Sequence, residues 1–428
     1  MQKEHIKKSP LGGIEGFSPE ESRGRGLLTF TILSISLLTV MAGAAVAPAL
    51  GIIQQHFSSA PSLLIKLIVS MPALFIIIVN LCFAQLCKYM RTKTIALVGL
   101  IMYVVCGMGA FFAEDIVTLL ILRALLGVSV GMIMPLSTGL LAYYFPPEKM
   151  SQLMGLSAAM NQMGGVVATM LAGLLATVEW NYAFLVYGLG LIAVILVLLY
   201  LPNEKLHPGR SYKKEAHNVM PGIDDSEAYA EAHTAGTWIL LRRFHPSILG
   251  MFLCMCIFFV FVTNFAITET GRFTSMEVTN LMVGTDIVAF LVGMVFGKIM
   301  GVMPLQMKYI APLTFLVGYM LIAFVPQTLT VIIGCACIGA ANGVGIPYLN
   351  TIASIKGGRD SITTVMPLIS AALYVGQFLS PMIVNSLSAI AFGDDNRGPY
   401  KVAVVLAVVY LLQVVATRKF QSLPPREH

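Results

Sequence analysis

Charged residues are scarce in this sequence. Of its 428 residues, only 11% are Asp, Glu, Lys or Arg, whereas 57% are hydrophobic. Soluble globular proteins carry about 25% charged residues, so this chain has too few to cover a surface that faces water. The shortage excludes a soluble protein of ordinary composition and predicts an all-α protein that crosses a bilayer several times.

Signals for nucleic-acid binding are also missing. The net charge of +6 would suggest a nucleic-acid partner in a soluble protein. Here the basic residues lie between apolar runs, as expected for loops at a membrane surface. We therefore expect no nucleic-acid partner.

The sequence lacks the usual motifs of metal and nucleotide sites, since it contains no H-E-x-x-H and no G-x-x-x-x-G-K-S/T. The pattern G-x-S-x-G occurs at Gly127–Gly131, but inside an apolar run and not at the strand-to-helix turn that the hydrolase motif requires. The seven histidines fall in tails, loops or span ends, and most of the seven cysteines lie inside apolar runs. These absences argue against an intramembrane enzyme, an ATP-driven machine, a disulfide framework, a metal site or a cofactor.

Twelve apolar runs are present, each about as long as the 20 residues that a helix needs to cross a bilayer. They cover residues 27–52, 61–85, 94–113, 116–144, 150–176, 181–201, 246–268, 276–300, 309–326, 329–352, 362–391 and 400–417. The run that begins at Leu27 is too long for the core of a cleaved signal peptide, so it is expected to be the first span.

One long polar break divides the chain. Residues 202–245 contain several Pro and Gly residues and mixed charges, and they separate six spans (27–201) from six more (246–417). Residues 1–26 and 418–428 form polar tails. We expect the break to be a linker between two six-helix halves.

Lys and Arg residues indicate the orientation of the spans. If the N-terminus lies inside, 22 of these residues face the cytoplasm, four face outward and Arg123 lies within a span. Cytoplasmic loops carry an excess of positive residues, so both termini and the 202–245 linker are expected in the cytoplasm. This orientation predicts a multi-pass protein of the cell inner (plasma) membrane.

The two halves share a short repeated pattern. Gly127, Gly131 and Pro135 in the fourth span match Gly339, Gly343 and Pro347 in the tenth at a constant offset of 212. The ends of the second and eighth spans also match, from Ala84 and Gly297, at an offset of 213. Because six is an even number of spans, repeated halves would have the same orientation in the membrane.

This organisation resembles the major facilitator superfamily of transporters. Arg123-x-x-x-Gly127-x-x-x-Gly131 is similar to its fourth-helix motif, which carries an arginine within the membrane. The loop from Ala84 to Lys93 is similar to its G-x-L-A-D-R-x-G-R-R motif, but Lys88 replaces the Asp that forms a conformational latch in the family. The resemblance implies a conformational role for a set of motif residues: Ala84, Lys88, Arg91, Lys93, Gly127, Gly131, Gly297 and Lys298.

Two further segments resemble bacterial drug and sugar efflux permeases within that superfamily. They are A-G-A-A-V-A-P-A-L from Ala42 and W-N-Y-A-F from Trp180. The fifth span has no Gly-Pro pair, which the antiporters of the superfamily carry there. This difference leaves the direction of transport open.

Two charged residues lie within spans and are candidates for proton coupling. Asp286 lies about 15 Å deep in the eighth span, at 1.5 Å per residue. Thr279, Met282, Gly293 and Gly297 share its helix face, so Asp286 is expected to point into the bundle as a proton or cation site, or as a hydrogen-bonded structural acid. Arg123 could bind an anionic substrate group or favour the charged form of a nearby carboxylate. It could instead have a structural role, by extending outward to the membrane surface or by holding helix ends.

Uncharged polar residues within spans are candidates for the substrate site. In repeated transporter folds this site lies near the membrane centre between the halves. Each of these residues could instead form a hydrogen bond between helices. The candidates are Asn161, Gln162, Asn264, Asn342, Tyr374 and Gln377.

Other charged residues lie near the ends of spans, where charges are common. Lys66 is expected to anchor the second span at the membrane surface. Glu269 and Arg272 close the seventh span and are expected to be loop charges or part of an outer gate.

The leading hypothesis is a secondary transporter that works by alternating access. It would act as a monomer and export a small organic or amphiphilic compound, driven by protons that enter through Asp286. The alternatives are uptake of a metabolite by proton symport or uniport on the same fold, and a sensor without transport, which would need an added signalling domain.

Overall fold

The computed structural model describes residues 19–144, 147–203, 237–303, 306–357 and 365–417. These residues form twelve helical spans that are long and apolar enough to cross a membrane, which confirms the predicted all-α membrane fold. The first six spans are built from α1 (Pro19–Ala44), η1 (Ala47–Ala49), α2 (Leu50–His56), α3 (Ser62–Tyr89), α4 (Thr92–Gly109), η2 (Ala110–Phe112), α5 (Ile116–Tyr144), α6 (Pro147–Ala176), η3 (Trp180–Leu189) and α7 (Gly190–Tyr200). The other six are α10 (Thr237–Thr268), α11 (Ser275–Val302), α12 (Met307–Phe324), α13 (Thr328–Gly357), α14 (Val365–Phe392) and α15 (Gly398–Ala416).

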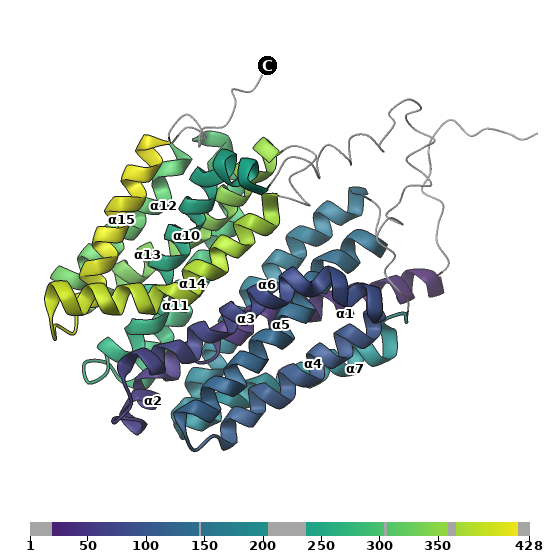
Figure 1. The fold of residues 1–428 in the computed structure, drawn as a ribbon, viewed down its shortest axis with the longest axis horizontal. Helices are drawn as coiled ribbons and strands as arrows, with labels where there is room; N and C mark the ends of the chain where they lie inside the picture. The colour runs from purple at the N-terminus through teal and green to yellow at the C-terminus, as the bar shows by residue number, and fades with distance from the viewer. Residues whose placement is uncertain (1–18, 145–146, 204–236, 304–305, 358–364, 418–428) are drawn as a thin grey trace, which may run out of the picture.

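The helices form two groups that lie side by side (Figure 1). In the N-terminal group, from α1 to α7, the closest pairs are α3 with α5, α1 with α6 and α4 with α5. In the C-terminal group, from α10 to α15, they are α10 with α14, α12 with α13 and α11 with α13. Most of the linker predicted over 202–245, residues 1–18 of the predicted N-terminal tail and the predicted C-terminal tail lie outside the described residues. Two helices begin earlier than predicted, since α1 starts at Pro19 inside the predicted tail and α10 starts at Thr237 inside the predicted linker.

Large apolar side chains cover the outer surface of the bundle. Leu81, Phe112, Val302 and Ile390 each expose three quarters or more of their surface. Such a surface would aggregate in water, whereas lipid chains solvate it. A helix also satisfies its backbone hydrogen bonds internally, which the bilayer interior requires.

The repeated glycines bring equivalent helices together in the two groups. A Cβ atom on Gly127 of α5 would lie only 2.7 Å from the Cα atom of Pro72 on α3. In the second group, a Cβ atom on Gly339 of α13 would contact the backbone of Thr285 on α11. Small residues allow this close approach, so the repeat seen in the sequence is a repeat of helix packing.

Two spans are less regular than the uninterrupted apolar runs suggest. The first span breaks after Ala44 and continues as η1 and α2, with Pro48 inside the first turn of η1. Proline provides no backbone donor, which favours a new helix start at this point. The sixth span begins as the 3-10 helix η3, whose Tyr187 packs so tightly on α4 that a Cβ atom on Gly107 would lie 2.5 Å from it.

The two ends of the bundle differ. We call the end that carries Tyr200 and the start of α10 the linker face, and the opposite end, with the α10–α11 and α14–α15 turns, the distal face. The groups lie close together at the distal face and further apart toward the linker face (Figure 1). At the distal face, a Cβ atom on Gly51 of α2 would lie 2.5 Å from the carbonyl oxygen of Ala266 on α10.

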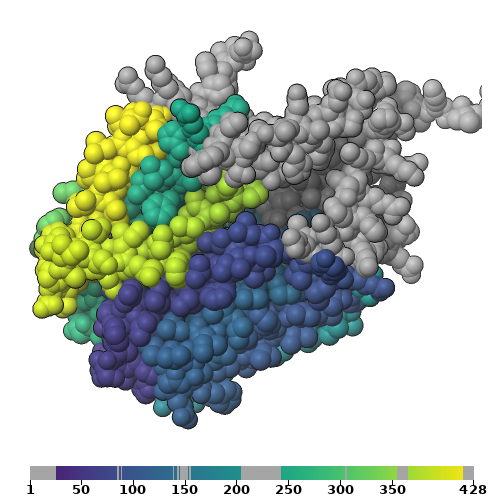
Figure 2. Space-filling view, viewed as in Figure 1, coloured from purple at the N-terminus to yellow at the C-terminus, as the bar shows by residue number. Residues whose placement is uncertain are grey.

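Two further helix pairs join the groups along their sides. One is α3 with α14, which are in direct contact in the space-filling view (Figure 2), and the other is α6 with α11. A Cβ atom on Gly173 of α6 would lie 2.7 Å from the Cβ atom of Thr279 on α11. Polar residues that reach across these two contacts are therefore positioned to sense relative movement of the groups.

Candidate functional site

Asp286 lies at the contact between α6 and α11. Its Oδ2 atom accepts a hydrogen bond of 3.0 Å from the hydroxyl of Thr169, which belongs to the other group of helices. Thr169 itself is buried. An acidic side chain within a membrane span is therefore held at the boundary between the two groups.

A capping box defines the beginning of α11. Thr274 and Glu277 form a capping box, in which the backbone N–H of Thr274 donates to Glu277 Oε2 at 2.8 Å. Thr279 and Met282 are buried, as expected from the face that they share with Asp286. Gly293, further along α11, instead approaches α13, where a Cβ atom on it would lie 3.8 Å from the carbonyl oxygen of Gly343.

Arg123 is sealed inside the N-terminal group. It is 1% exposed, and its guanidinium donates to the Ala42 carbonyl at 3.1 Å and to the Tyr187 hydroxyl at 2.7 and 2.9 Å. The guanidinium also lies over the rings of Phe184 and Tyr187, 5.0 and 4.9 Å from their centres. Its neighbours therefore come from α1 and η3, and the structure does not bring it into contact with Asp286.

Two of the predicted substrate residues reach from α14 toward the N-terminal group. The Tyr374 hydroxyl lies 2.8 Å from the sulfur of Met134 on α5. The amide nitrogen of Gln377 would lie 3.5 Å from a Cβ atom on Gly43 of α1. Both side chains are partly buried at the boundary between the groups.

The other four predicted substrate residues differ in how their polar atoms are used. Asn161 accepts a hydrogen bond of 3.0 Å from Thr39 within the N-terminal group, and the neighbouring Gln162 is half-buried. Asn264 is buried and its amide donates to Val260 and Thr263, so it supports its own helix. Asn342 is 9% exposed, and among the described residues its buried Oδ1 atom has no hydrogen-bond donor.

Two polar residues at the group boundary were not among the predicted site residues. Asn385 accepts a hydrogen bond of 2.6 Å from Lys66, which joins α14 to α3. Asn385 lies on the same stripe of α14 as Tyr374 and Gln377, so helical spacing could have identified it. Thr169 gave no comparable signal, since threonine is common in these spans.

The comparisons with known proteins place the chain in a family. The sequence profile of the Major Facilitator Superfamily matches residues 32–381. The chain belongs to the Major Facilitator Superfamily. It is therefore a multi-pass membrane transporter of the class that moves small molecules.

Individual relatives are distant. The chain is 23% identical over 347 residues to the quinolone resistance protein NorA of Staphylococcus aureus (strain MRSA252), covering 77% of this chain and 81% of NorA. The crystal structure of the nucleoside transporter NupG (D323A mutant) superposes with a TM-score of 0.71 at 11% identity, covering 91% and 99% of the two chains. The D-xylose-proton symporter gives 0.68 at 13% identity, covering 90% and 97%. The structural matches are similar in fold alone.

The first copy of the loop motif forms a short turn at the linker face. Ala84 and Lys88 lie near the end of α3, and their side chains are outside the described part of the structure. Arg91 precedes α4 and is exposed, and Lys93 donates to the Leu198 carbonyl of α7 at 2.7 Å. This contact stays within the N-terminal group.

The second copy is more open. Nothing in the described structure lies within 4 Å of a Cβ atom on Gly297, and Lys298 is exposed. Gly127 and Gly131 of the other motif, by contrast, pack tightly on α3. The described contacts therefore give the fourth-span glycines a packing role and leave Gly297 unconstrained.

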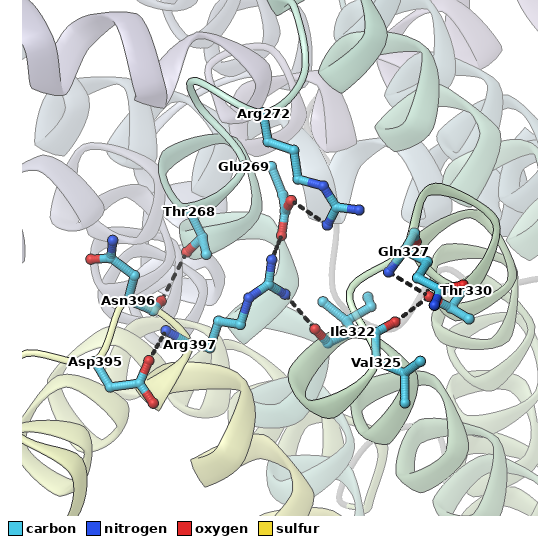
Figure 3. Close-up of polar contacts among 10 residues, drawn as sticks. All are labelled: Thr268, Glu269, Arg272, Ile322, Val325, Gln327, Thr330, Asp395, Asn396 and Arg397. Atoms are coloured by element: carbon cyan, nitrogen blue, oxygen red, sulfur yellow. Dashed lines mark hydrogen bonds and ion pairs between the residues drawn. The ribbon is translucent and has the colours of Figure 1, made fainter.

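A polar cluster ties the distal loops of the C-terminal group together (Figure 3). Glu269 is fully buried and pairs with Arg272 at 3.5 Å and with Arg397 at 3.3 Å. Arg397 also donates to the Ile322 carbonyl at the end of α12. The turn that returns Arg272 to Glu269 contains Gly271 at φ +91°, where a side chain would be strained.

This cluster supports the surface on which the other group rests. Glu269 directly follows the segment of α10 that Gly51 of α2 approaches. The cluster is closed within the C-terminal group in the described contacts, because each of its ion pairs joins residues of that group. Glu269 and Arg272 therefore fix the shape of the distal contact and do not themselves bridge it.

Proposed function

We propose that this chain is a proton-coupled secondary transporter that exports a small organic or amphiphilic compound from the cytoplasm. A single chain carries both helix groups, so one molecule is sufficient for alternating access. In this proposal the protein lies in the plasma membrane, with its linker face on the cytoplasmic side. The distribution of 22 Lys and Arg residues on that side against four on the other supports this orientation.

The observation that carries the proposal is the contact between Asp286 and Thr169. A charged residue within a span is costly and is normally retained for function. The 3.0 Å hydrogen bond joins the two groups, so the surroundings of the carboxyl group change when the groups separate. Binding of a proton to Asp286 and the relative position of the groups are therefore thermodynamically linked.

The substrate is proposed to bind between the groups toward the linker face. Tyr374 and Gln377 extend from α14 toward α5 and α1, and Asn342 offers an acceptor without a described donor. Asn161 and Gln162 complete the polar set from α6. Few polar groups among many apolar side chains suit a compound that is itself mostly apolar. The distant relative NorA is named for quinolone resistance, which supports a small organic substrate.

Arg123 has a structural role in this proposal. Its charge is satisfied by Ala42 and Tyr187, and both contacts lie within the N-terminal group. We propose that Arg123 holds α1 against α5 and η3 while the group moves as a unit.

The proposal is tested in a bacterium without its own efflux pumps. Growth is measured with ethidium, a quinolone and a quaternary ammonium detergent, for the wild type, Asp286→Asn and the control Glu277→Gln, which alters an exposed acid on the same helix. We expect protection by the wild type and the control, and loss of protection by Asp286→Asn at equal expression. Full protection by Asp286→Asn would remove Asp286 as the coupling residue, and no protection by well-expressed wild type would contradict export.

A further inference from the structure

Lys66 is a cation buried in the contact between the groups. It lies near the start of α3, is 5% exposed, and its Nζ atom is 2.6 Å from Asn385 Oδ1 on α14. The sequence suggested an anchor at the membrane surface, which would leave the ammonium in water. Instead the α3–α14 contact covers it at the distal end of both helices.

The positive charge of the Lys66 ammonium group has few described partners in this position. An ammonium has three N–H donors, and in the described structure one of them reaches an acceptor. That acceptor is a neutral amide. The ion pairs of the described residues involve Glu269 and Asp395, and none of them includes Lys66.

Two opposing effects decide what Lys66 does to the distal contact. The hydrogen bond to Asn385 favours the closed contact, as any bond between the groups would. Removing the ammonium from water opposes closure, and this desolvation exceeds what one neutral acceptor returns. When the groups separate at the distal face, the ammonium regains water and the penalty disappears.

We propose that Lys66 is a positioning residue that drives reopening of the distal face, and that Asn385 limits the cost of closing it. The inference rests on the proposed alternating access of the transporter. A lock would be a contact that stabilises the closed distal face. Lys66 has the opposite effect, because its buried charge makes the closed arrangement less stable than an apolar side chain at the same position would.

Ser70 provides a reporter for this contact. It lies one turn after Lys66 on α3, is fully buried, and its Oγ atom has no partner among the described residues. Helical spacing puts Ser70 on the face of α3 that carries Lys66, so a membrane-impermeant maleimide is expected to react with Ser70→Cys when α3 and α14 separate. Labelling of the parent protein, which has seven native cysteines, gives the background to subtract.

The test compares the labelling rate of Ser70→Cys alone with the rates after adding Lys66→Met, Lys66→Arg or Asn385→Leu. We expect Lys66→Met to slow labelling about tenfold, equivalent to ~1.4 kcal/mol. Asn385→Leu should accelerate labelling, because the charge then lacks its acceptor. Lys66→Arg keeps the positive charge, so its labelling rate should stay close to that of Ser70→Cys alone.

Other results would overturn the inference. A lock predicts faster labelling in both Lys66→Met and Asn385→Leu, and a packing role predicts no change in either. A parallel melting curve checks folding: Lys66→Met should be at least as stable as the parent, and a large loss of stability would also contradict the inference. Labelling is measured in right-side-out and inside-out vesicles without substrate or a proton gradient, so failure of proton coupling at Asp286 would leave this result unaffected.

Discussion

Replacing Gly127 with alanine places a methyl group where the backbone of α3 already lies. The new Cβ atom would be 2.7 Å from Pro72 Cα and 3.0 Å from Phe75 Cβ, and it would also contact the Pro72 carbonyl oxygen. Backbone atoms cannot rotate away as the end of a flexible side chain can. The variant therefore has to push α3 and α5 apart.

The size of the effect follows from two opposing contributions. Extra volume in a packed interior costs about 1–3 kcal/mol. Alanine is favoured over glycine within a helix by about 1 kcal/mol. We expect Gly127→Ala to lose up to about 2 kcal/mol of stability relative to the wild type, and about 1–3 kcal/mol relative to the same substitution at a site where only the helix preference acts.

Gly139 is such a site on the same helix. No atom lies within 4 Å of a Cβ atom there, so Gly139→Ala should be as stable as the wild type or slightly more stable. The second repeat offers the same comparison, with Gly339→Ala expected to be destabilised and Gly284→Ala unaffected. Thermal melting of the purified proteins in detergent measures all four variants. Equal melting temperatures for Gly127→Ala and Gly139→Ala would refute the packing role of the repeated glycines.

Three further predictions concern polar groups. Tyr187→Phe removes an acceptor from the buried Arg123 and should cost about 1.5–3 kcal/mol in thermal stability. Glu269→Gln removes the charge of both ion pairs in the distal cluster and should lower the free energy of unfolding by about 1–3 kcal/mol, a limited loss because the paired arginines are partly exposed. The melting temperature should fall accordingly, and an unchanged melting temperature would contradict the cluster's role. The hydrogen bond from Lys401 lowers the pKa of Asp395 below its usual value, so its stabilising effect is present at neutral pH and is lost as the pH falls through that lowered pKa. An acid titration of thermal stability should therefore be shallower for Asp395→Asn than for the wild type.

Much of the architecture could be predicted because membrane spans depend on local composition. The twelve apolar runs correspond to the twelve helical spans within a few residues. The offset between Gly127 and Gly339 predicted two related halves, and both glycines pack against the equivalent neighbouring helix. The break at Pro48 was missed, because hydropathy measures the apolar character of a segment and not the regularity of its backbone.

The pairing of polar residues across the groups could not be predicted in the same way. Helical spacing placed Asp286 on an inward face, but the identity of Thr169 depends on how α6 meets α11. The same limit applies to Lys66, whose position near a span end suggested the membrane surface. Only the docking of α14 on α3 buries it beside Asn385.

Proton movement through Asp286 can be measured directly. Purified wild type, Asp286→Asn and Glu277→Gln are reconstituted in liposomes that contain a pH-sensitive dye, and ethidium is added to start transport. We expect ethidium movement by the wild type and by Glu277→Gln to be accompanied by proton flux in the opposite direction, and we expect no such proton flux with Asp286→Asn. Undiminished proton-coupled ethidium transport by Asp286→Asn would show that Asp286 does not carry the proton.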